Sequence, residues 1–276
     1  MPAEPVEAGL LTAAGELCAQ LARWALAEIA AGAQAAAGAR TKGDAADWVT
    51  DTDLSVERQV REAIAARFPG HALRGEEHGR GGAAGSDFTW CIDPVDGSCN
   101  FAHRIPWYAF SIALLHGEEP VAGAVADCAR GELVTAVRGR GLQLAGRPFQ
   151  PPAARGGDPA GGVVTLELAN ARHWPGLDGC LRWLEGHLVT ARIMGSSALA
   201  VTQAALGRAE GAVLGGSDPI DVGAAVLLAR EAGLRVLGAD GRASGWPRGG
   251  LVAARAGVAE ALWGAAFGGQ TQVQSG

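Results

Sequence analysis

The sequence predicts an α/β fold in which layers of helix and sheet are stacked on one another. Segments with helical periodicity open and close the chain, and short apolar or β-branched runs bounded by Gly, Pro or acidic residues occur in both halves. With 276 residues, 48% of them hydrophobic and 19% charged, the chain can bury a sizeable core and is neither disordered nor fibrous. We therefore expect stacked α and β layers.

The first half is predicted to begin with two helices and to continue with strands. Leu10, Leu17 and Trp24 recur at helical spacing and predict a helix over 8–30. A second helix contains Leu54, Val56, Val60 and Ile64 and ends near Pro69-Gly70. The strands predicted in this half cover 88–92, 108–115, 121–127 and 132–137.

A segment rich in Pro and Gly, residues 146–162, is predicted to connect the two halves. After it the sequence predicts a strand at 163–168, helices near 197–207 and from about 221, strands at 234–237 and 251–254, and a last helix to about 267. We interpret 1–270 as one domain of two halves, about 1–150 and about 160–267. A flexible tail, 268–276, follows.

Composition excludes several classes of partner. The net charge is −6, from 23 basic and 29 acidic residues, which argues against nucleic acid. The Ala-rich stretch 13–39 is interrupted by Glu16, Arg23 and Glu28, so we expect no membrane span. The five cysteines are scattered without a CxxC pair, and the N-terminus lacks a basic signal region, which together indicate reduced thiols and a cytoplasmic protein.

The most informative motif is DPVDGS at 93–98, directly after a predicted strand. Asp93 and Asp96 can converge on one point from this turn, where they would repel each other unless a cation lay between them. Carboxylate oxygens favour Mg²⁺, Mn²⁺ or Ca²⁺ over Zn²⁺. Gly97 permits an unusual backbone angle or a close ligand approach. The alternative is a surface Asx turn, because Asp, Pro and Gly are common turn residues.

Three further acidic clusters accompany this motif, and each has a simpler interpretation when taken alone. Glu76, in GEE at 75–77, fits a solvated loop. Four aspartates in 44–53 fit a charged face with Asp53 as an N-cap, and Asp221, in DPID at 218–221, also fits an N-cap. The order and spacing of all four clusters carry the functional hypothesis.

Taken together, the motifs resemble those of the inositol monophosphatase family, which are magnesium-dependent, lithium-sensitive sugar phosphatases. The matching segments are Lys42…Asp47-x-Val49-Thr50-x-x-Asp53, Gly75-Glu76-Glu77, Trp90-Cys91-Ile92-Asp93-Pro94-Val95-Asp96-Gly97-Ser98-x-Asn100-Phe101, Arg192-x-x-Gly195-Ser196, and Ile220-Asp221-x-x-Ala224 followed by Glu231-Ala232-Gly233. The resemblance covers about 8–267.

The resemblance implies an αβαβα sandwich with the active site between its halves. By position, Glu76, Asp93 and the Val95 carbonyl would hold a first Mg²⁺, and Asp93, Asp96 and Asp221 would hold a second. A third, weaker ion would be bound by Glu76 and water, and Mn²⁺ is a possible substitute.

The resemblance also implies how the reaction proceeds. Glu76, together with Ser98 hydrogen-bonded to Asp53, would orient a water for in-line attack on phosphorus. The Gly97 and Ser98 amides would receive a phosphate oxygen. The implied substrate-binding residues are Asp96, Gly97, Ser98, Gly195, Ser196, Ser197 and Asp221. Ser98 as a nucleophile is disfavoured, because the motif places no His beside it.

The family acts on small phosphate esters, and inositol monophosphate is the favoured substrate. Leu214, however, stands at the approximate position of a Glu that contacts inositol hydroxyls in relatives, and a Leu accepts no hydrogen bond. Histidinol phosphate, fructose 1,6-bisphosphate and a 3′-phosphoadenosine nucleotide therefore remain alternatives. A non-catalytic regulatory relative remains another. The resemblance further implies a homodimer, for which the Ala-rich segment 25–39 is one candidate face.

Overall fold

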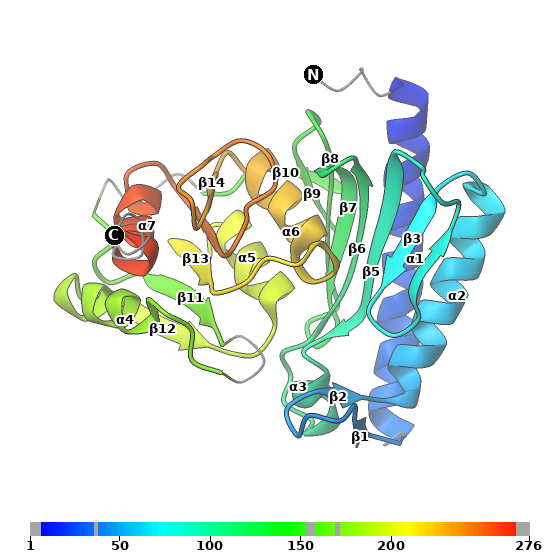
Figure 1. Cartoon of the computed structure of the whole chain (residues 1–276), viewed down its shortest axis with the longest axis horizontal. Coiled ribbons are helices and arrows are strands. Elements are labelled where there is room, and N and C mark those ends of the chain that lie inside the picture. The colour runs from blue at the N-terminus through cyan, green and yellow to red at the C-terminus, as the bar shows by residue number, and fades with distance from the viewer. Residues whose placement is uncertain (1–6, 36–37, 153–157, 169–171, 269–276) are drawn as a thin grey trace.

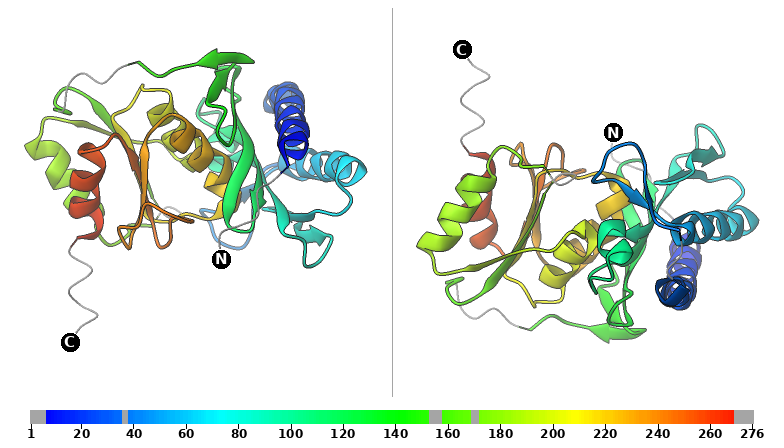
Figure 2. Two further views of the ribbon diagram at one scale, coloured as in Figure 1. Left: turned by 90° about the horizontal axis from the view of Figure 1, so that it is seen from above. Right: turned by 90° about the horizontal axis from the view of Figure 1, so that it is seen from below.

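The protein folds into five alternating layers of helix and sheet (Figure 1). The computed structural model describes residues 7–35, 38–152, 158–168 and 172–268. From one side to the other, the layers are a helix pair, an eight-stranded sheet, a central helix pair, a five-stranded sheet and a second outer helix pair. Views from above and below show the same order (Figure 2). The predicted αβαβα sandwich is confirmed.

The first half supplies the first helix layer and the larger sheet. Its helices are α1 (Ala8–Ala35), α2 (Asp51–Arg67) and the short α3 (Ser98–Ala102), and a small strand pair is formed by β1 (Arg40–Thr41) and β2 (Trp48–Val49). The larger sheet contains β3 (Ala72–Gly75), β4 (Gly79–Gly82), β5 (Phe88–Asp96), β6 (Ala109–His116), β7 (Glu119–Asp127), β8 (Glu132–Val137), β9 (Leu142–Leu144) and β10 (Arg147–Phe149). Their order is β10-β9-β8-β7-β6-β5-β3-β4, with only the β3–β5 pair parallel.

The second half supplies the other three layers. The central helices are α5 (Ser197–Ala205) and α6 (Pro219–Glu231), and the outer ones are α4 (Leu177–Gly186) and α7 (Val258–Phe267). The smaller sheet has the order β12 (Thr190–Ile193), β11 (Val163–Glu167), β13 (Gly211–Leu214), β15 (Leu251–Ala254) and β14 (Arg235–Gly238). Strand β11 is parallel to both of its neighbours, as expected where helices cover both faces.

Alternation along β5 explains how the layers hold together. Trp90 and Ile92 pack into the core between the larger sheet and α1 and α2, whereas Cys91 lies in the core that contains α5 and α6. Helix α6 is buried continuously from Val222 to Ala229, which is expected of a helix enclosed between two sheets. A third apolar cluster joins the smaller sheet to α4 and α7.

The end of β5 turns the chain toward the second half. The ladder with β6 is interrupted between Asp93 and Asp96, so the strand bends there. Gly97 follows with φ of 95°, and a Cβ at this position would lie 2.9 Å from the carbonyl oxygen of Gly195. Glycine therefore allows the left-handed turn and the close approach of the two halves.

Two helix caps differ from the expected ones. Thr50, not Asp53, is the N-cap of α2, and Asp53 is the third helical residue of a capping box in which each side chain bonds the other's backbone amide. Asp218, not Asp221, caps α6, with its Oδ1 accepting from the Ile220 amide at 2.9 Å. Both predicted caps therefore lie one turn inside their helices, where Asp53 completes the capping box of α2 and Asp221 takes no part in the cap of α6.

The predicted connector 146–162 is partly structured, since it contains β10, whereas 153–157 fall outside the described residues. Of the predicted tail, Gly268 caps α7, and 269–276 fall outside the described residues. All five cysteines are free thiols. None of the described helices is long and apolar enough to cross a lipid bilayer.

Candidate active site

Several element ends meet at one pocket between the halves, which we call the carboxylate pocket. It has a volume of about 480 Å³ and is reached by the ends of β3, β5 and β11 and by the starts of α3, α5 and α6. Of the predicted site residues, Glu76, Asp93, Val95, Asp96, Gly97, Ser98, Gly195, Ser197 and Asp221 line it. Asp53 and Ser196 contact this set from behind. The structure thus brings together residues that lie far apart in the sequence.

Asp93 is buried among the other acids of this pocket. It is 3% exposed, and its Oδ1 is buried without a hydrogen-bond partner among the described residues. Burial, followed by the charges of Glu76, Asp96 and Asp221, raises the pKa of Asp93 well above its usual value. A buried carboxylate oxygen that lacks a partner is costly, so this position favours a bound positive group.

Asp96 connects the first half to the start of α5. The Ser196 hydroxyl and the Ala198 amide donate to its Oδ2, the latter at 2.7 Å, and the Ser197 amide donates to its Oδ1 at 3.2 Å. Burial raises the pKa of Asp96 to about 6, although these hydrogen bonds act in the opposite direction. Ser196 and Ser197 therefore already serve to position Asp96.

Asp221 enters the pocket from the first turn of α6. Burial, followed by the charges of Asp96 and Glu76, raises its pKa to about 8. The charge of Arg74 lowers the pKa of Asp221, but Arg74 forms its ion pair with the N-cap Asp218, with Nη2–Oδ2 at 2.6 Å. Asp221 thus lies in an excess of negative charge.

Glu76 differs from the other acids because it has a basic partner. The Lys42 ammonium lies 3.1 Å from its Oε1 and also contacts Glu77 and Asp47. Although burial opposes it, hydrogen bonds and charges from Glu77 and Glu76 raise the pKa of Lys42 above its usual value. A cation held by Glu76 would therefore compete with this ammonium group.

The hydrogen bond expected between Ser98 and Asp53 is present. The Ser98 hydroxyl lies 2.9 Å from Asp53 Oδ1 and 2.8 Å from the Val95 carbonyl oxygen, and its single proton can be donated to one of them at a time. Asp53 Oδ2 accepts from both the Thr50 amide and the Thr50 hydroxyl. The capping box of α2 therefore fixes the carboxylate that faces Ser98.

Within the described residues, no three or more His, Cys, Asp or Glu side chains are arranged so that they could hold a metal ion as they stand. The reason is visible in their contacts. Asp96 is engaged by Ser196, Ser197 and Ala198, and Glu76 is engaged by Lys42. The acids share one pocket but are held by protein partners, so coordination would require side-chain rotation. Their roles as ligands remain a prediction.

Two buried glutamates that no local sequence pattern marks, Glu57 and Glu167, support the pocket from opposite sides. Glu57, fully buried in α2, accepts from the Glu77 amide at 2.6 Å and the His78 amide at 3.1 Å and so fixes the turn after Glu76. A Cβ on Gly75 would collide with the Glu57 carboxylate, so glycine at 75 makes room for it.

Glu167, at the end of β11, supports the opposite side of the pocket. It accepts from the Gly195 amide at 2.7 Å and from the Met194 amide at 3.3 Å, while Asn100 donates to the Met194 carbonyl at 2.6 Å. Burial raises the pKa of Glu167 to about 7, against the effect of the Gly195 hydrogen bond. Both contacts hold the loop that leads into Ser196.

A smaller cavity of about 250 Å³ adjoins the carboxylate pocket and shares Glu167, Leu168, Ser197 and Asp221 with it. Leu214 is buried in its wall beside Glu167, its partner in the β11–β13 ladder. Asp218 also lines this cavity. Leu214, Asp218 and Ser197 therefore all face the same space.

Comparison with known proteins agrees with this architecture. The inositol monophosphatase family model matches residues 9–271. Inositol monophosphatase 2 of Rattus norvegicus is 36% identical over 208 residues, which cover 73% of this chain and 71% of that protein. Nus factor SuhB of Pasteurella multocida is 35% identical over 210 residues, which cover 75% of this chain and 78% of that protein.

Solved structures show the same relationship. The extragenic suppressor protein suhB from Bartonella henselae superposes with a TM-score of 0.81 at 26% identity, covering 91% of this chain and 96% of that one. Inositol monophosphatase from Anabaena sp. superposes with a TM-score of 0.78 at 28% identity, covering 93% and 96%. On this evidence, the chain belongs to the inositol monophosphatase family.

Proposed function

We propose that this protein is a divalent-cation-dependent phosphomonoesterase that hydrolyses a small polyol or sugar phosphate, with inositol monophosphate as the favoured substrate. Family membership supports the phosphatase chemistry. The observation that carries the proposal is the orphaned Oδ1 of buried Asp93, which lies in a pocket with Glu76, Asp96 and Asp221. Four carboxylates in one pocket are compatible with folding when cations neutralise them.

The residues present fit Mg²⁺, because the donors are all hard oxygens. Glu76, Asp93 and the Val95 carbonyl would hold one ion, Asp93, Asp96 and Asp221 a second, and Glu76 with water a weaker third. Bound cations would supply the positive charge that attracts a phosphate dianion and would make water a stronger acid. Mn²⁺ has similar ligand preferences and is the expected substitute.

The chain's own residues would position the reactants. Ser98, whose hydroxyl can donate to Asp53, leaves its oxygen free to accept a hydrogen bond from a water, and the Glu76 carboxylate can accept the second hydrogen bond of that water and take up its proton. That water would attack phosphorus in line with the leaving alcohol. Gly97 and Ser98, which line the pocket, would bind a phosphate oxygen through their amides.

The alcohol half of the substrate would enter the cavity beside Leu214. Leu214 presents an apolar wall, whereas Ser197, Glu167 and Asp221 supply polar groups there. Asp218 is already occupied by Arg74 and by the Ile220 amide. Glu167 is likewise occupied by the Met194 and Gly195 amides, so hydroxyl recognition would depend on Ser197 and Asp221, together with the phosphate-binding amides.

A substrate panel tests this function. We expect phosphate release from inositol monophosphate with about 5 mM Mg²⁺ and no release with EDTA. Histidinol phosphate, fructose 1,6-bisphosphate and a 3′-phosphoadenosine nucleotide would be assayed in parallel, with kcat/KM as the measure. A preference of tenfold or more for one of these three would replace the inositol assignment and leave the chemistry intact.

A binding protein without catalysis is the competing proposal, because relatives such as the Pasteurella multocida protein are named as Nus factors. Retention of Asp93, Asp96, Glu76 and Asp221 favours catalysis, since a binding protein gains nothing from four neighbouring carboxylates. Failure to release phosphate from any ester of the panel, in a folded sample with Mg²⁺, would favour the binding protein.

Glu167→Gln is expected to lower kcat/KM by roughly tenfold, because an amide offers one acceptor oxygen where the carboxylate holds both the Met194 and Gly195 amides. The fall should appear mainly in kcat, with binding of Mg²⁺ retained. Glu185→Gln, near the end of α4, provides a matched control. A variant with unchanged kinetics would show that Glu167 does not position the loop.

We also propose that the protein forms a homodimer in the cytoplasm, in line with its free thiols. Ile105 and Ile193 are large apolar residues that are 48% and 43% exposed. They lie near one another, because Asn100 accepts the Ile105 amide on its carbonyl and donates to the Met194 carbonyl. Light scattering should give twice the chain mass, and Ile193→Asp should reduce it to the monomer value.

A further inference from the structure

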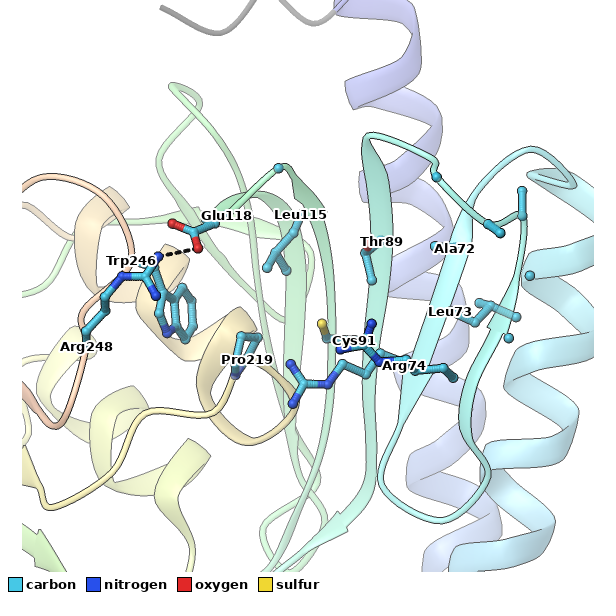
Figure 3. A pocket seen from close by; sticks show the side chains of 17 residues that line it. Ala72, Leu73, Arg74, Thr89, Cys91, Leu115, Glu118, Pro219, Trp246 and Arg248 are labelled. Carbon is cyan, nitrogen blue, oxygen red and sulfur yellow. Dashed lines mark hydrogen bonds and ion pairs between the residues drawn. The ribbon is translucent and has the colours of Figure 1, made fainter. Parts of the chain in front are cut away.

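A separate cavity lies between the β3–β4 hairpin, the start of α6 and the loop that carries Trp246 (Figure 3). Its volume is about 710 Å³, and it shares no lining residue with the carboxylate pocket. Cys91, Leu115 and Pro219 give it an apolar floor. Ligand pockets commonly measure about 300–1,000 Å³, so the size suits a small organic molecule.

Two arginines face each other on one wall of this cavity. Arg74 and Arg80 are directly paired residues of the antiparallel β3–β4 ladder, so their side chains leave the same face of the hairpin. Like charges directly opposite each other destabilise a strand pair. An anion placed between them would convert this repulsion into attraction.

Acidic side chains of the protein neutralise only one of these two arginines. Arg74 forms an ion pair with Asp218, with Nη2–Oδ2 at 2.6 Å. Arg80 has no hydrogen-bond or ion-pair partner within the part of the chain that the structure describes. The Arg80 guanidinium on the cavity wall can therefore direct its N–H donors to a ligand.

The opposite wall adds a third guanidinium and a flat aromatic ring. Arg248 pairs with Glu118, but both side chains are more than 60% exposed, so water weakens the pair and Arg248 can turn to a stronger partner. The Trp246 indole is fixed by a hydrogen bond from its Nε1 to the Ser217 carbonyl at 2.9 Å. A fixed indole lining a cavity is a surface on which a planar ring can stack.

We propose that this arginine cavity, lined by Arg74, Arg80 and Arg248, binds a nucleoside monophosphate at a site distinct from the carboxylate pocket. Guanidinium groups bind phosphate through paired hydrogen bonds, which favours a phosphorylated ligand over other anions. Trp246 and the apolar floor favour a ligand whose other end is a planar ring. This inference stands on the cavity alone and does not rest on the proposed phosphatase activity.

Calorimetric titration of the full chain with AMP in the presence of EDTA tests the proposal. Without cations the carboxylate pocket repels anions, so any binding of AMP reports on the arginine cavity. We expect one site per chain with a Kd on the order of 10–100 µM. Inorganic phosphate lacks the planar ring and adenosine lacks the phosphate, so each should bind at least tenfold more weakly than AMP.

Arg80→Gln should weaken AMP binding at least tenfold, whereas Arg67→Gln, a surface change in α2, should leave it unchanged. Arg80→Gln should also melt no lower than wild type, because it removes a like-charge pair and Arg80 is exposed. Absence of AMP binding, or equal binding by the Arg80→Gln variant, would overturn the proposal. Phosphate binding as tightly as AMP would overturn the assignment of a nucleoside ligand.

Discussion

Asp93→Asn is expected to abolish phosphate release and cation binding together, with a loss of at least about 10³-fold in kcat/KM, equivalent to about 4 kcal/mol. Asp93 is the acid predicted to contact both main ions, and its Oδ1 has no partner among the described residues. An amide is neutral, binds divalent cations weakly and cannot replace that oxygen's charge. Binding of Mg²⁺ would be measured by calorimetry and turnover by phosphate release.

The fold is expected to survive this change, which makes the result interpretable. Burial and three neighbouring acids already raise the pKa of Asp93, so a neutral side chain removes repulsion in the metal-free protein. Thermal unfolding in EDTA should therefore occur at the same temperature as in wild type or higher. Asp178→Asn, at an exposed position in the first turn of α4, is the matched control. Full turnover by the Asp93→Asn variant would contradict the proposed mechanism.

Strands were predicted from the sequence where a local pattern of residues marks them. Strand 132–137 was predicted with the bounds of β8, because its residues are apolar or β-branched and turns bound it. The β3–β4 hairpin was missed. Strand β4 reads GRGG and is exposed throughout, so neither alternation nor β-propensity marks it, and pairing with β3 alone makes it a strand.

Site residues, too, were predicted only where a local motif contains them. Asp93 and Asp96 were found because Pro and Gly surround them in a recognisable turn. Glu57 was missed because it lies in a helix rich in charged residues, where a single Glu looks solvent-exposed. Its burial depends on the space left by Gly75, which is distant in sequence. Supporting residues of this kind are defined by tertiary contacts, and no local pattern marks them.

In the absence of divalent cations, the free energy of unfolding of the protein is expected to decrease as the pH rises from about 5 to about 8. In the folded protein the pKa of Asp96 is raised to about 6, that of Glu167 to about 7 and that of Asp221 to about 8. In the unfolded chain these groups titrate near pH 4. Between pH 4 and the raised pKa values, the folded protein binds more protons than the unfolded chain. The free energy of unfolding therefore falls as the pH rises through this window and levels off above it.

Melting temperatures in EDTA at pH 6 and pH 8 measure this effect. We expect a decrease of roughly 3–12 °C, since raising pKa values by one to two units in the folded protein corresponds to about 1.4–3 kcal/mol, and each kcal/mol shifts the melting temperature of a chain this size by about 2–4 °C. Mg²⁺ at about 5 mM should raise the melting temperature more at pH 8 than at pH 6, because deprotonated carboxylates bind it. Asp221→Asn should reduce the decrease in EDTA, whereas Asp178→Asn should not. A melting temperature that is constant or rises between these pH values in EDTA would show that the acids are not crowded in the folded protein, and the reason to place cations among them would be lost.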